Sequence, residues 1–259
     1  MSFYYQLDLQ FKGTRFLGWQ KQKDFEPTVQ DTLETACSKI FKSDEISSIG
    51  SGRTDTGVHS LGHKVKVKVP FELPPEAIRK GLNSHLPTDI RILKVKKSTV
   101  SFKPTNDAIK KEYIYLFSNF EDSGALQNDF IVNNRFSLDI EVMKQACKLF
   151  IGKHDFKNFY CVGSDINSTV REIYECNLEF KEMDFHGILP NHYVFSIVGN
   201  GFLKQMVRLI VGTLWEVGRG KVSLEELSED LASPGSRKLG ITAPPNGLYK
   251  RKVCYKEDS

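Results

Sequence analysis

The first half of the chain alternates between the two-residue hydrophobic period of strands and the longer period of helices. Every second residue from Phe3 to Phe11 is hydrophobic, which predicts a strand. Pro27 and Thr28 begin a predicted helix with a hydrophobic stripe along one side. That stripe consists of Val29, Leu33, Ala36, Cys37, Ile40 and Phe41. A strand over 64–69, a short helix from Pro74 and a strand over 90–95 follow. This half is predicted as strand, helix, strand, helix, strand.

The pattern breaks at 101–107 and then resumes, so we place a lobe boundary there. Strands are predicted over 110–117, 170–180 and 193–198, and helices over 139–151 and 202–217. Ser223 and Glu226 have the spacing of a capping box, which begins a further helix. We therefore predict the α+β class, with one lobe over 1–104, a second over 105–259, and helices on one face of each sheet.

Composition indicates an ordinary water-soluble protein. The chain has 259 residues, of which 40% are hydrophobic and 26% charged, and no apolar run approaches the ~20 residues that span a bilayer. The first residues lack the basic and apolar parts of a secretory signal. The five cysteines are scattered without C-x-x-C spacing, so neither a disulfide framework nor a zinc site is indicated. We expect a reducing, cytoplasmic location.

Positive charge is concentrated in the first half. The net charge is +4, and residues 1–112 hold 19 Lys and Arg against 13 Asp and Glu, which gives +6. The remaining residues give −2, with 17 basic and 19 acidic side chains. This asymmetry favours a polyanionic partner. Taken alone, Lys64, Lys66 and Lys68 are as readily explained as a solvated face of a strand.

The segment Gly52-Arg53-Thr54-Asp55-Thr56-Gly57-Val58-His59 is the strongest candidate for chemistry. It places Asp55 on a glycine-bounded turn that leads into the strand over 64–69, where valines and lysines alternate. A carboxylate on such a turn is held rigidly and stays accessible to a substrate. The alternative is a surface loop in which Asp55 caps a turn and pairs with Arg53.

The common nucleotide, metalloprotease and hydrolase motifs are missing. His59 and His63 have helical spacing but lie in a segment that reads as turn and strand, so a metal site there is not expected. Tyr113 lies on a predicted strand, where tyrosine is usually a core residue. Arg208 lies opposite the hydrophobic stripe of its predicted helix. It belongs either to a solvated face or to a second buried contact, which Gly212 would allow by close approach of another element.

Five segments together resemble the tRNA pseudouridine synthase A family, in the family's order and over nearly the whole chain. They are the Asp55 octapeptide; Gly18-Trp19-Gln20-Lys21-Gln22 with Thr28-Val29-Gln30; Ala108-Ile109-Lys110-Lys111-Glu112-Tyr113-Ile114-Tyr115; Asn200 to Arg208 with Ile210-Val211-Gly212; and Ala243-Pro244-Pro245-Asn246-Gly247-Leu248-Tyr249. Two positions depart from the family pattern. Lys103-Pro104-Thr105 replaces the usual His-Ala-Arg, and Lys250 replaces an apolar residue.

The resemblance implies isomerisation of uridine to pseudouridine in the anticodon stem-loop of tRNA, at positions 38, 39 and/or 40, without cofactor or metal. It implies two RRM-like or ferredoxin-like lobes whose antiparallel sheets join into one central sheet, with a cleft between the lobes. Asp55 would act on a flipped-out uridine as a nucleophile or as a base. Arg208 would pair with Asp55, and Tyr113 would stack on the uracil. Arg53 would fill the vacated space or hold a phosphate, and Leu248 would line the pocket.

The resemblance also implies RNA recognition through phosphate and shape, and a homodimer. The expected basic contacts are Lys64, Lys66, Lys103 and Lys110, together with Arg15, Lys21 and Lys23. Three alternatives stay open: the same reaction on another RNA, a non-catalytic RNA-binding protein, and a carboxylate-dependent hydrolase. A hydrolase should carry a second catalytic acid near Asp55, and the sequence offers none.

Overall fold

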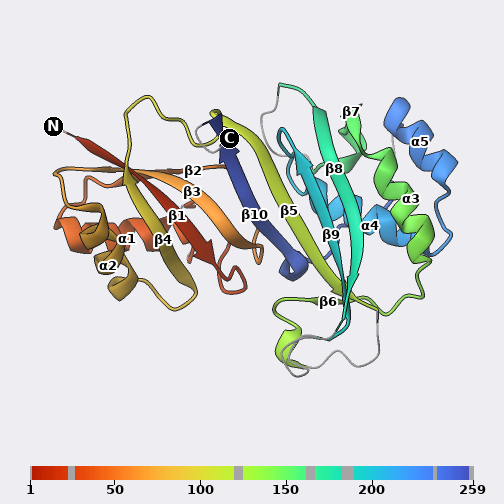
Figure 1. Cartoon of the computed structure of the whole chain (residues 1–259), viewed down its shortest axis with the longest axis horizontal. Coiled ribbons are helices and arrows are strands. Elements are labelled where there is room, and N and C mark those ends of the chain that lie inside the picture. The colour runs from red at the N-terminus through yellow and green to blue at the C-terminus, as the bar shows by residue number, and fades with distance from the viewer. Residues whose placement is uncertain are drawn as a thin grey trace. The chain divides into compact units, whose positions relative to one another are not determined.

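A computed structural model of the chain describes residues 2–22, 27–119, 125–161, 167–182, 190–235 and 238–256. The chain forms two compact units: unit 1 is Met1–Ile109 with Tyr249–Ser259, and unit 2 is Lys110–Leu248. Both units combine sheet and helices, so the predicted α+β class is confirmed (Figure 1). The division differs from the predicted lobes over 1–104 and 105–259, because the last strand returns to unit 1.

Unit 1 contains a sheet in the order β4-β1-β3-β10, with β2 paired to β3. Its elements are β1 (Phe3–Phe11), α1 (Val29–Phe41), β2 (Ser47–Gly50), β3 (His59–Val69), α2 (Pro75–His85), β4 (Ile90–Lys97) and β10 (Leu248–Tyr255). β1 runs antiparallel to β3 along nearly the whole length of β3. On the other edge of β3, β2 pairs antiparallel with residues 65–68 and β10 pairs parallel with residues 59–60. The Asp55 loop connects β2 to β3, at the point where this edge changes partner.

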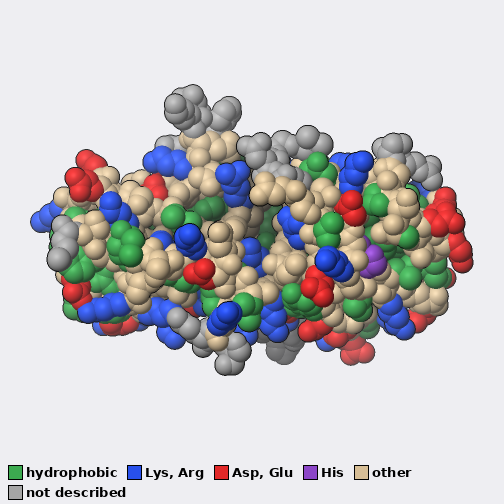
Figure 2. All heavy atoms as spheres, turned by 90° about the horizontal axis from the view of Figure 1, so that it is seen from above, with side chains coloured by type: hydrophobic (Ala, Val, Ile, Leu, Met, Phe, Trp, Pro, Cys, Tyr) green, Lys and Arg blue, Asp and Glu red, His purple; other side chains and the backbone are tan. Residues whose placement is uncertain are grey.

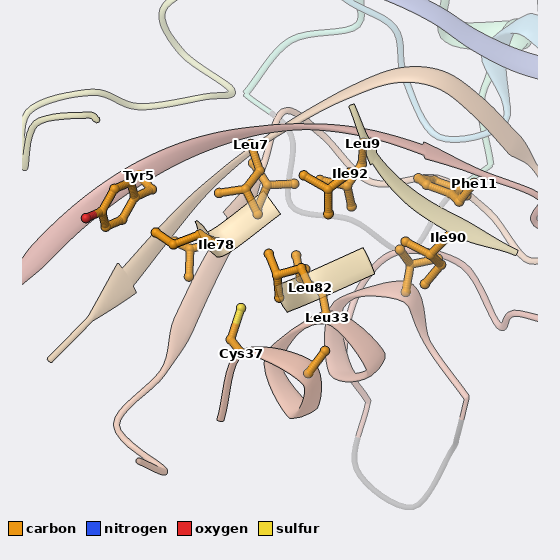
Figure 3. Packing of buried hydrophobic residues seen from close by; sticks show 14 of the residues in the cluster. Tyr5, Leu7, Leu9, Phe11, Leu33, Cys37, Ile78, Leu82, Ile90 and Ile92 are labelled. Atoms are coloured by element: carbon orange, nitrogen blue, oxygen red, sulfur yellow. The ribbon is translucent and has the colours of Figure 1, made fainter. Parts of the chain in front are cut away.

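The core of unit 1 follows the predicted hydrophobic pattern. Thr28 caps α1, with its side chain accepting a hydrogen bond from the N–H of Asp31. The hydrophobic side of β1 and β4 faces α1 and α2, as Figure 3 shows. The buried residues drawn and labelled there are Tyr5, Leu7, Leu9, Phe11, Leu33, Cys37, Ile78, Leu82, Ile90 and Ile92. Burial of this apolar surface stabilises the frame that carries the Asp55 loop.

On the opposite face of β3, Lys68 is exposed as the sequence predicted, whereas Lys64 and Lys66 are not. Lys64 is half-buried, and its Nζ donates to Asp8 Oδ2 at 2.7 Å. Lys66 is only 8% exposed, and its Nζ donates to the carbonyls of Val100 (3.0 Å) and Phe102. The expected presentation of Lys66 to RNA is therefore corrected: the chain around 100–102 covers it. A lysine buried this deeply needs such acceptors for its ammonium.

Unit 2 contains a sheet in the order β5-β9-β8-β7, with β6 paired to β5. Its elements are β5 (Ala108–Ser118), β6 (Val132–Asn133), α3 (Ile140–Leu149), β7 (Gly152–Asp155), β8 (Val170–Lys181), β9 (His192–Gly199), α4 (Met206–Gly218) and α5 (Leu224–Ala232). Among the described residues of unit 2, short 3-10 helices are formed by Ala125–Gln127, Lys157–Phe159 and Pro245–Gly247. The predicted capping box is confirmed, with Ser223 and Glu226 bonded reciprocally at the start of α5. α3 packs on α4 and on β8.

Helix α4 is shorter and more buried than predicted. It begins at Met206 because Gln205 has φ +60°, which interrupts the helical pattern predicted from Phe202. Trp215 is buried, although it lies on the same side of the predicted helix as Arg208. A Cβ added at Gly212 would lie 1.7 Å from the carbonyl oxygen of Ile241. The close approach at Gly212 is therefore confirmed, and the solvated-face interpretation of this helix is wrong.

Within the described ranges, no helix is long and apolar enough to cross a membrane. The five cysteines are free thiols, and four of them are buried. Burial raises the pKa of the Cys37 thiol to about 12, and the nearby charge of Glu34 acts in the same direction.

Candidate active site

The Asp55 loop is held by glycine at both ends. Gly52 has φ +130° and Gly57 has φ +80°, a region of backbone conformation that side chains with a Cβ rarely adopt. Between them Asp55 is half-buried and Arg53 is exposed. The N–H of Val58 donates to Asp55 O at 3.2 Å and closes the turn. The glycine-bounded turn that the sequence predicted is therefore present, with its acid partly accessible.

A second loop of unit 1 fixes this turn from the side. The N–H of Trp19 donates to Thr54 O at 3.2 Å, and the N–H of Gly57 donates to Phe16 O at 3.2 Å. The N–H of Gly13 donates to His59 Nδ1 at 2.9 Å, which places the proton of this buried imidazole on Nε2. These bonds hold the turn through backbone atoms and one histidine ring.

His59 and His63 lie on β3, as the sequence indicated, and not on a helix. The His59 ring stacks on Tyr249 with 4.7 Å between ring centroids, and the His63 ring lies 4.2 Å from that of Trp19. Both are nearly fully buried. Over the described residues, no group of three or more His, Cys, Asp and Glu side chains is arranged to hold a metal ion.

In unit 2, Tyr113 and Tyr115 share the face of β5 that is directed toward α4. Tyr115 is fully buried and lies edge-on to Trp215 of α4 at 5.9 Å. Tyr113 is only half-buried and lies edge-on to Phe202, at 5.0 Å between centroids. Burial raises the pKa of Tyr115, and its hydroxyl donates to Pro244 O at 2.9 Å. Of this pair, Tyr113 therefore has the accessible ring.

Arg208 is positioned by the segment that precedes β10. Its Nε donates to Ala243 O at 2.7 Å, and the N–H of Ala243 donates to Arg208 O at 3.1 Å. This reciprocal pair locks the guanidinium beside the first turn of α4. Its positive charge acts on nearby Tyr115, where it opposes the effect of burial on the pKa. Leu248, at the end of the same segment, is 5% exposed. The predicted pairing of Asp55 with Arg208 joins residues of different units and stays a prediction.

The predicted basic contacts fall into two groups. Arg53, Lys103 and Lys110 are exposed. Arg15 pairs with Asp89, and Lys21 Nζ lies 2.5 Å from Asp31 Oδ1. Lys23 lies outside the described residues. Figure 2 shows Lys and Arg side chains spread over the face it draws, with Asp and Glu side chains between them. Much of the positive charge of unit 1 is thus offset locally, and the three exposed residues are the better candidates for phosphate contacts.

Unit 2 adds two basic residues that the sequence did not single out. Burial lowers the pKa of Lys111, and the positive charge of Arg171 lowers it further. Burial also lowers the pKa of Arg171, whose Nη1 donates to the carbonyls of Ser168 and Val170. Two cations held near each other repel, and an anion bound between them would relieve that repulsion. Lys111 lies two residues before Tyr113, and this proximity could have marked Lys111 as a candidate site residue from the sequence.

Comparison with known proteins identifies relatives of this chain. A family described as tRNA pseudouridine synthase matches residues 9–104 and 146–256. The tRNA pseudouridine synthase A 2 of Clostridium perfringens is 37% identical over 249 residues, with 96% of this chain and 98% of the relative covered. The tRNA pseudouridine synthase A of Thermoanaerobacter sp. is 39% identical over 247 residues, with 95% and 97% covered. That of Bacillus pumilus is 37% identical over 246 residues, with 95% and 96% covered.

The chain belongs to the tRNA pseudouridine synthase family. The resemblance drawn from the five segments is confirmed. The matched ranges contain Arg53, Asp55, Arg208 and Leu248, whereas Tyr113 falls between them. A solved Cbf5-Nop10-Gar1 complex is similar at 11% identity and a TM-score of 0.32, over 95% of this chain and 58% of that one. This likeness is too distant to add to the assignment.

For this member of the pseudouridine synthase family, we expect Arg53→Ala to lower turnover more than tRNA binding. Arg53 is exposed on the loop that carries Asp55, and the expected role of its guanidinium is to support a displaced nucleotide. We expect kcat to fall on the order of 10- to 100-fold, with a smaller change in Kd because many phosphate contacts share the binding energy. Single-turnover rates and filter binding measure the two effects. An equal loss in both would mean that Arg53 acts only as a binding residue.

Proposed function

We propose that this protein isomerises uridine to pseudouridine in the anticodon stem-loop of tRNA, at positions 38, 39 and/or 40. The proposal rests on the position of Asp55. A member of this family presents a half-buried carboxylate on a rigid, glycine-bounded loop.

The reaction rearranges bonds within one nucleotide. The bond between N1 of uracil and C1′ of ribose breaks, the base turns, and a bond between C5 and C1′ forms. The C5 hydrogen leaves as a proton, and N1 gains a proton. Nothing is oxidised or reduced. Asp55 serves either as the nucleophile that attacks the sugar or the base, or as the base that removes the 2′ proton of the ribose. Both routes require the ionised carboxylate.

The residues of unit 2 take the supporting roles that the resemblance gives them. Tyr113 stacks on the uracil, which its half-buried ring beside Phe202 supports. In this proposal Arg208 pairs with the carboxylate of Asp55, and its Nε contact with Ala243 O supports a guanidinium of fixed direction. Leu248 contributes apolar surface.

The tRNA is bound mainly through its backbone. The target uridine leaves the stack, at a cost of a few kcal/mol. Arg53, Lys103 and Lys110 are exposed and suit phosphate contacts, and the Lys111–Arg171 pair suits one more. We further propose that the protein works as a homodimer, as the resemblance implies, and in the cytoplasm, as its scattered cysteines suggest.

The deciding experiment maps pseudouridines in tRNA from cells that lack this protein. We expect pseudouridine to be lost at one or more of positions 38, 39 and 40 and restored by the wild-type gene. Restoration by the Asp55→Asn variant would contradict the role of Asp55. Loss at other RNA positions alone would keep the reaction and overturn the target. No loss at any position in cellular RNA would overturn the function.

A further inference from the structure

Unit 1 contains a lysine in its interior. Lys250 on β10 has no solvent-exposed surface and ranks with Trp19 and Phe41 among the largest fully buried side chains. Lysine is almost never fully buried unless its ammonium is bonded. Removing a charge from water is unfavourable even with good partners, and an apolar side chain would fill the same space without that penalty.

The ammonium of Lys250 is bonded to two buried side chains. Its Nζ donates to Ser51 Oγ at 2.8 Å and lies 3.1 Å from His63 Nδ1. Ser51 and His63 are both fully buried. The His63 ring is held in turn by Trp19 and Phe11, with centroid distances of 4.2 Å and 5.7 Å. The positions of these partners are therefore fixed by packing.

These contacts lie at the base of the Asp55 loop. Ser51 is the first residue after β2. Its N–H donates to Lys64 O at 2.8 Å, and its Oγ also accepts from the N–H of Lys64 at 3.2 Å. Gly52 follows directly, and Asp55 lies four residues beyond Ser51. The ammonium of Lys250 thus reaches the residue from which the loop departs.

The backbone of Lys250 reaches the other end of the same loop. Its carbonyl oxygen accepts from Ser60 Oγ at 3.0 Å, and it is paired with Ser60 in the parallel ladder. Neighbouring Tyr249 stacks on His59. One residue of β10 therefore contacts both Ser51, where the loop begins, and Ser60, just after the loop ends. A charged donor at this point orders the loop more strongly than a neutral one.

We propose that Lys250 is a positioning residue for the Asp55 loop. Its ammonium holds Ser51 while its backbone holds Ser60, and together they fix the direction in which Asp55 is presented. This inference rests on the proposed role of Asp55. Lys250 contacts no RNA, because it is fully buried. Its contribution is to kcat and not to substrate affinity.

The test compares Lys250→Met, Ser51→Ala and the double variant in the full-length protein. Methionine keeps the length of the side chain and removes the charge. We expect kcat to fall on the order of 10- to 100-fold in Lys250→Met, while KM for tRNA stays near that of wild type. We expect Tm to be equal to or above that of wild type, because a buried charge has been removed. Hydrogen exchange of the amides of 52–58 should become faster, with the rest of unit 1 unchanged.

The Ser51→Ala variant distinguishes a role of Lys250 in positioning the loop from a role in the packing of unit 1. It leaves the ammonium buried without one acceptor, so we expect a lower Tm together with the same fall in kcat. Adding Lys250→Met to Ser51→Ala should raise Tm again and lower kcat no further, because Ser51→Ala has already broken the contact between Lys250 and Ser51. Lys252→Met, on the exposed part of the same strand, is the matched control and should leave kcat and loop exchange unchanged.

Two results would overturn the inference. One is a wild-type kcat in Lys250→Met. The other is a fall in Tm with faster exchange throughout unit 1, which would make Lys250 a general structural residue. If the wild-type protein forms no pseudouridine in any RNA, the proposed function fails by itself. The exchange rates of 52–58 then still decide whether Lys250 orders the loop.

Discussion

Asp55→Asn should bind tRNA like the wild-type protein and form no pseudouridine. The substitution keeps the shape of the side chain, and its amide can neither form the covalent bond nor accept the proton that the reaction needs. The turn keeps its geometry, because the bonds Trp19 N–Thr54 O, Gly57 N–Phe16 O and Val58 N–Asp55 O all use backbone atoms. We expect the rate to fall on the order of 10⁴-fold or more, as when other enzymes lose a residue of their catalytic unit.

The measurement is the release of tritium from tRNA labelled at C5 of uracil, paired with filter binding of the same tRNA. Affinity should stay close to that of wild type, because phosphate contacts dominate the binding of nucleic acids. Asp44→Asn, an exposed acid of unit 1, is the control and should keep full activity. Substantial tritium release by Asp55→Asn would remove Asp55 from the chemistry. Loss of binding would show that the carboxylate organises the RNA contact instead.

Gly212→Ala should destabilise unit 2 and reduce activity at the same time. A Cβ at this position would lie 1.7 Å from Ile241 O, and Gly240 in turn lies against the backbone of Thr213. Backbone atoms cannot rotate away as a side chain could, so the segment around 240–241 must move off α4. Overpacking of this kind costs about 3 kcal/mol, which for a chain of this size lowers Tm by roughly 6 to 12 °C.

Activity should fall as well, because the displaced segment carries Ala243. Arg208 lies one helical turn before Gly212, and its Nε donates to Ala243 O. Calorimetry and the tritium assay measure the two effects. Gly235→Ala is the matched control: among the described residues, its added Cβ would meet Asp230 Oδ1 at 3.8 Å, an ordinary contact distance. A Gly212→Ala protein with wild-type Tm would mean that the segment adapts without strain.

Local sequence patterns predicted most of the elements, with errors where a pattern was short or continued past its true end. β1 and α1 appear with their predicted buried residues because strict periodicity and the Thr28 cap determine them locally. β2 was missed, since four residues of alternating burial resemble any loop. The start of α4 was predicted too early, because the hydrophobic spacing of the helix extends back to Phe202. In the structure Gln205 has a left-handed conformation, so the helix begins only at Met206.

Some features of the candidate site follow from neighbouring residues, and others depend on distant parts of the chain. The glycines around Asp55 and the capping box at Ser223 follow from the conformational preferences of a few adjacent residues, which the sequence contains. The burial of Lys66 depends on the segment around 100–102, more than 30 residues later in the chain, whose carbonyls accept from its ammonium. Burial of a charged side chain is decided by such distant neighbours, and alternation of valine and lysine carries no information about them.

The sequence by itself determined the family, the α+β class and the turn that presents Asp55, because motifs and local periodicity depend on neighbouring residues. Only the tertiary structure decided that the last strand lies against β3, that Lys250 of that strand is buried under Ser51, and that Gly212 receives the backbone of Ile241. Each of these contacts joins positions far apart in the chain, and at Gly212 the close packing of two backbones selects glycine. Their energies come from burial and packing, which exist only once the chain has folded.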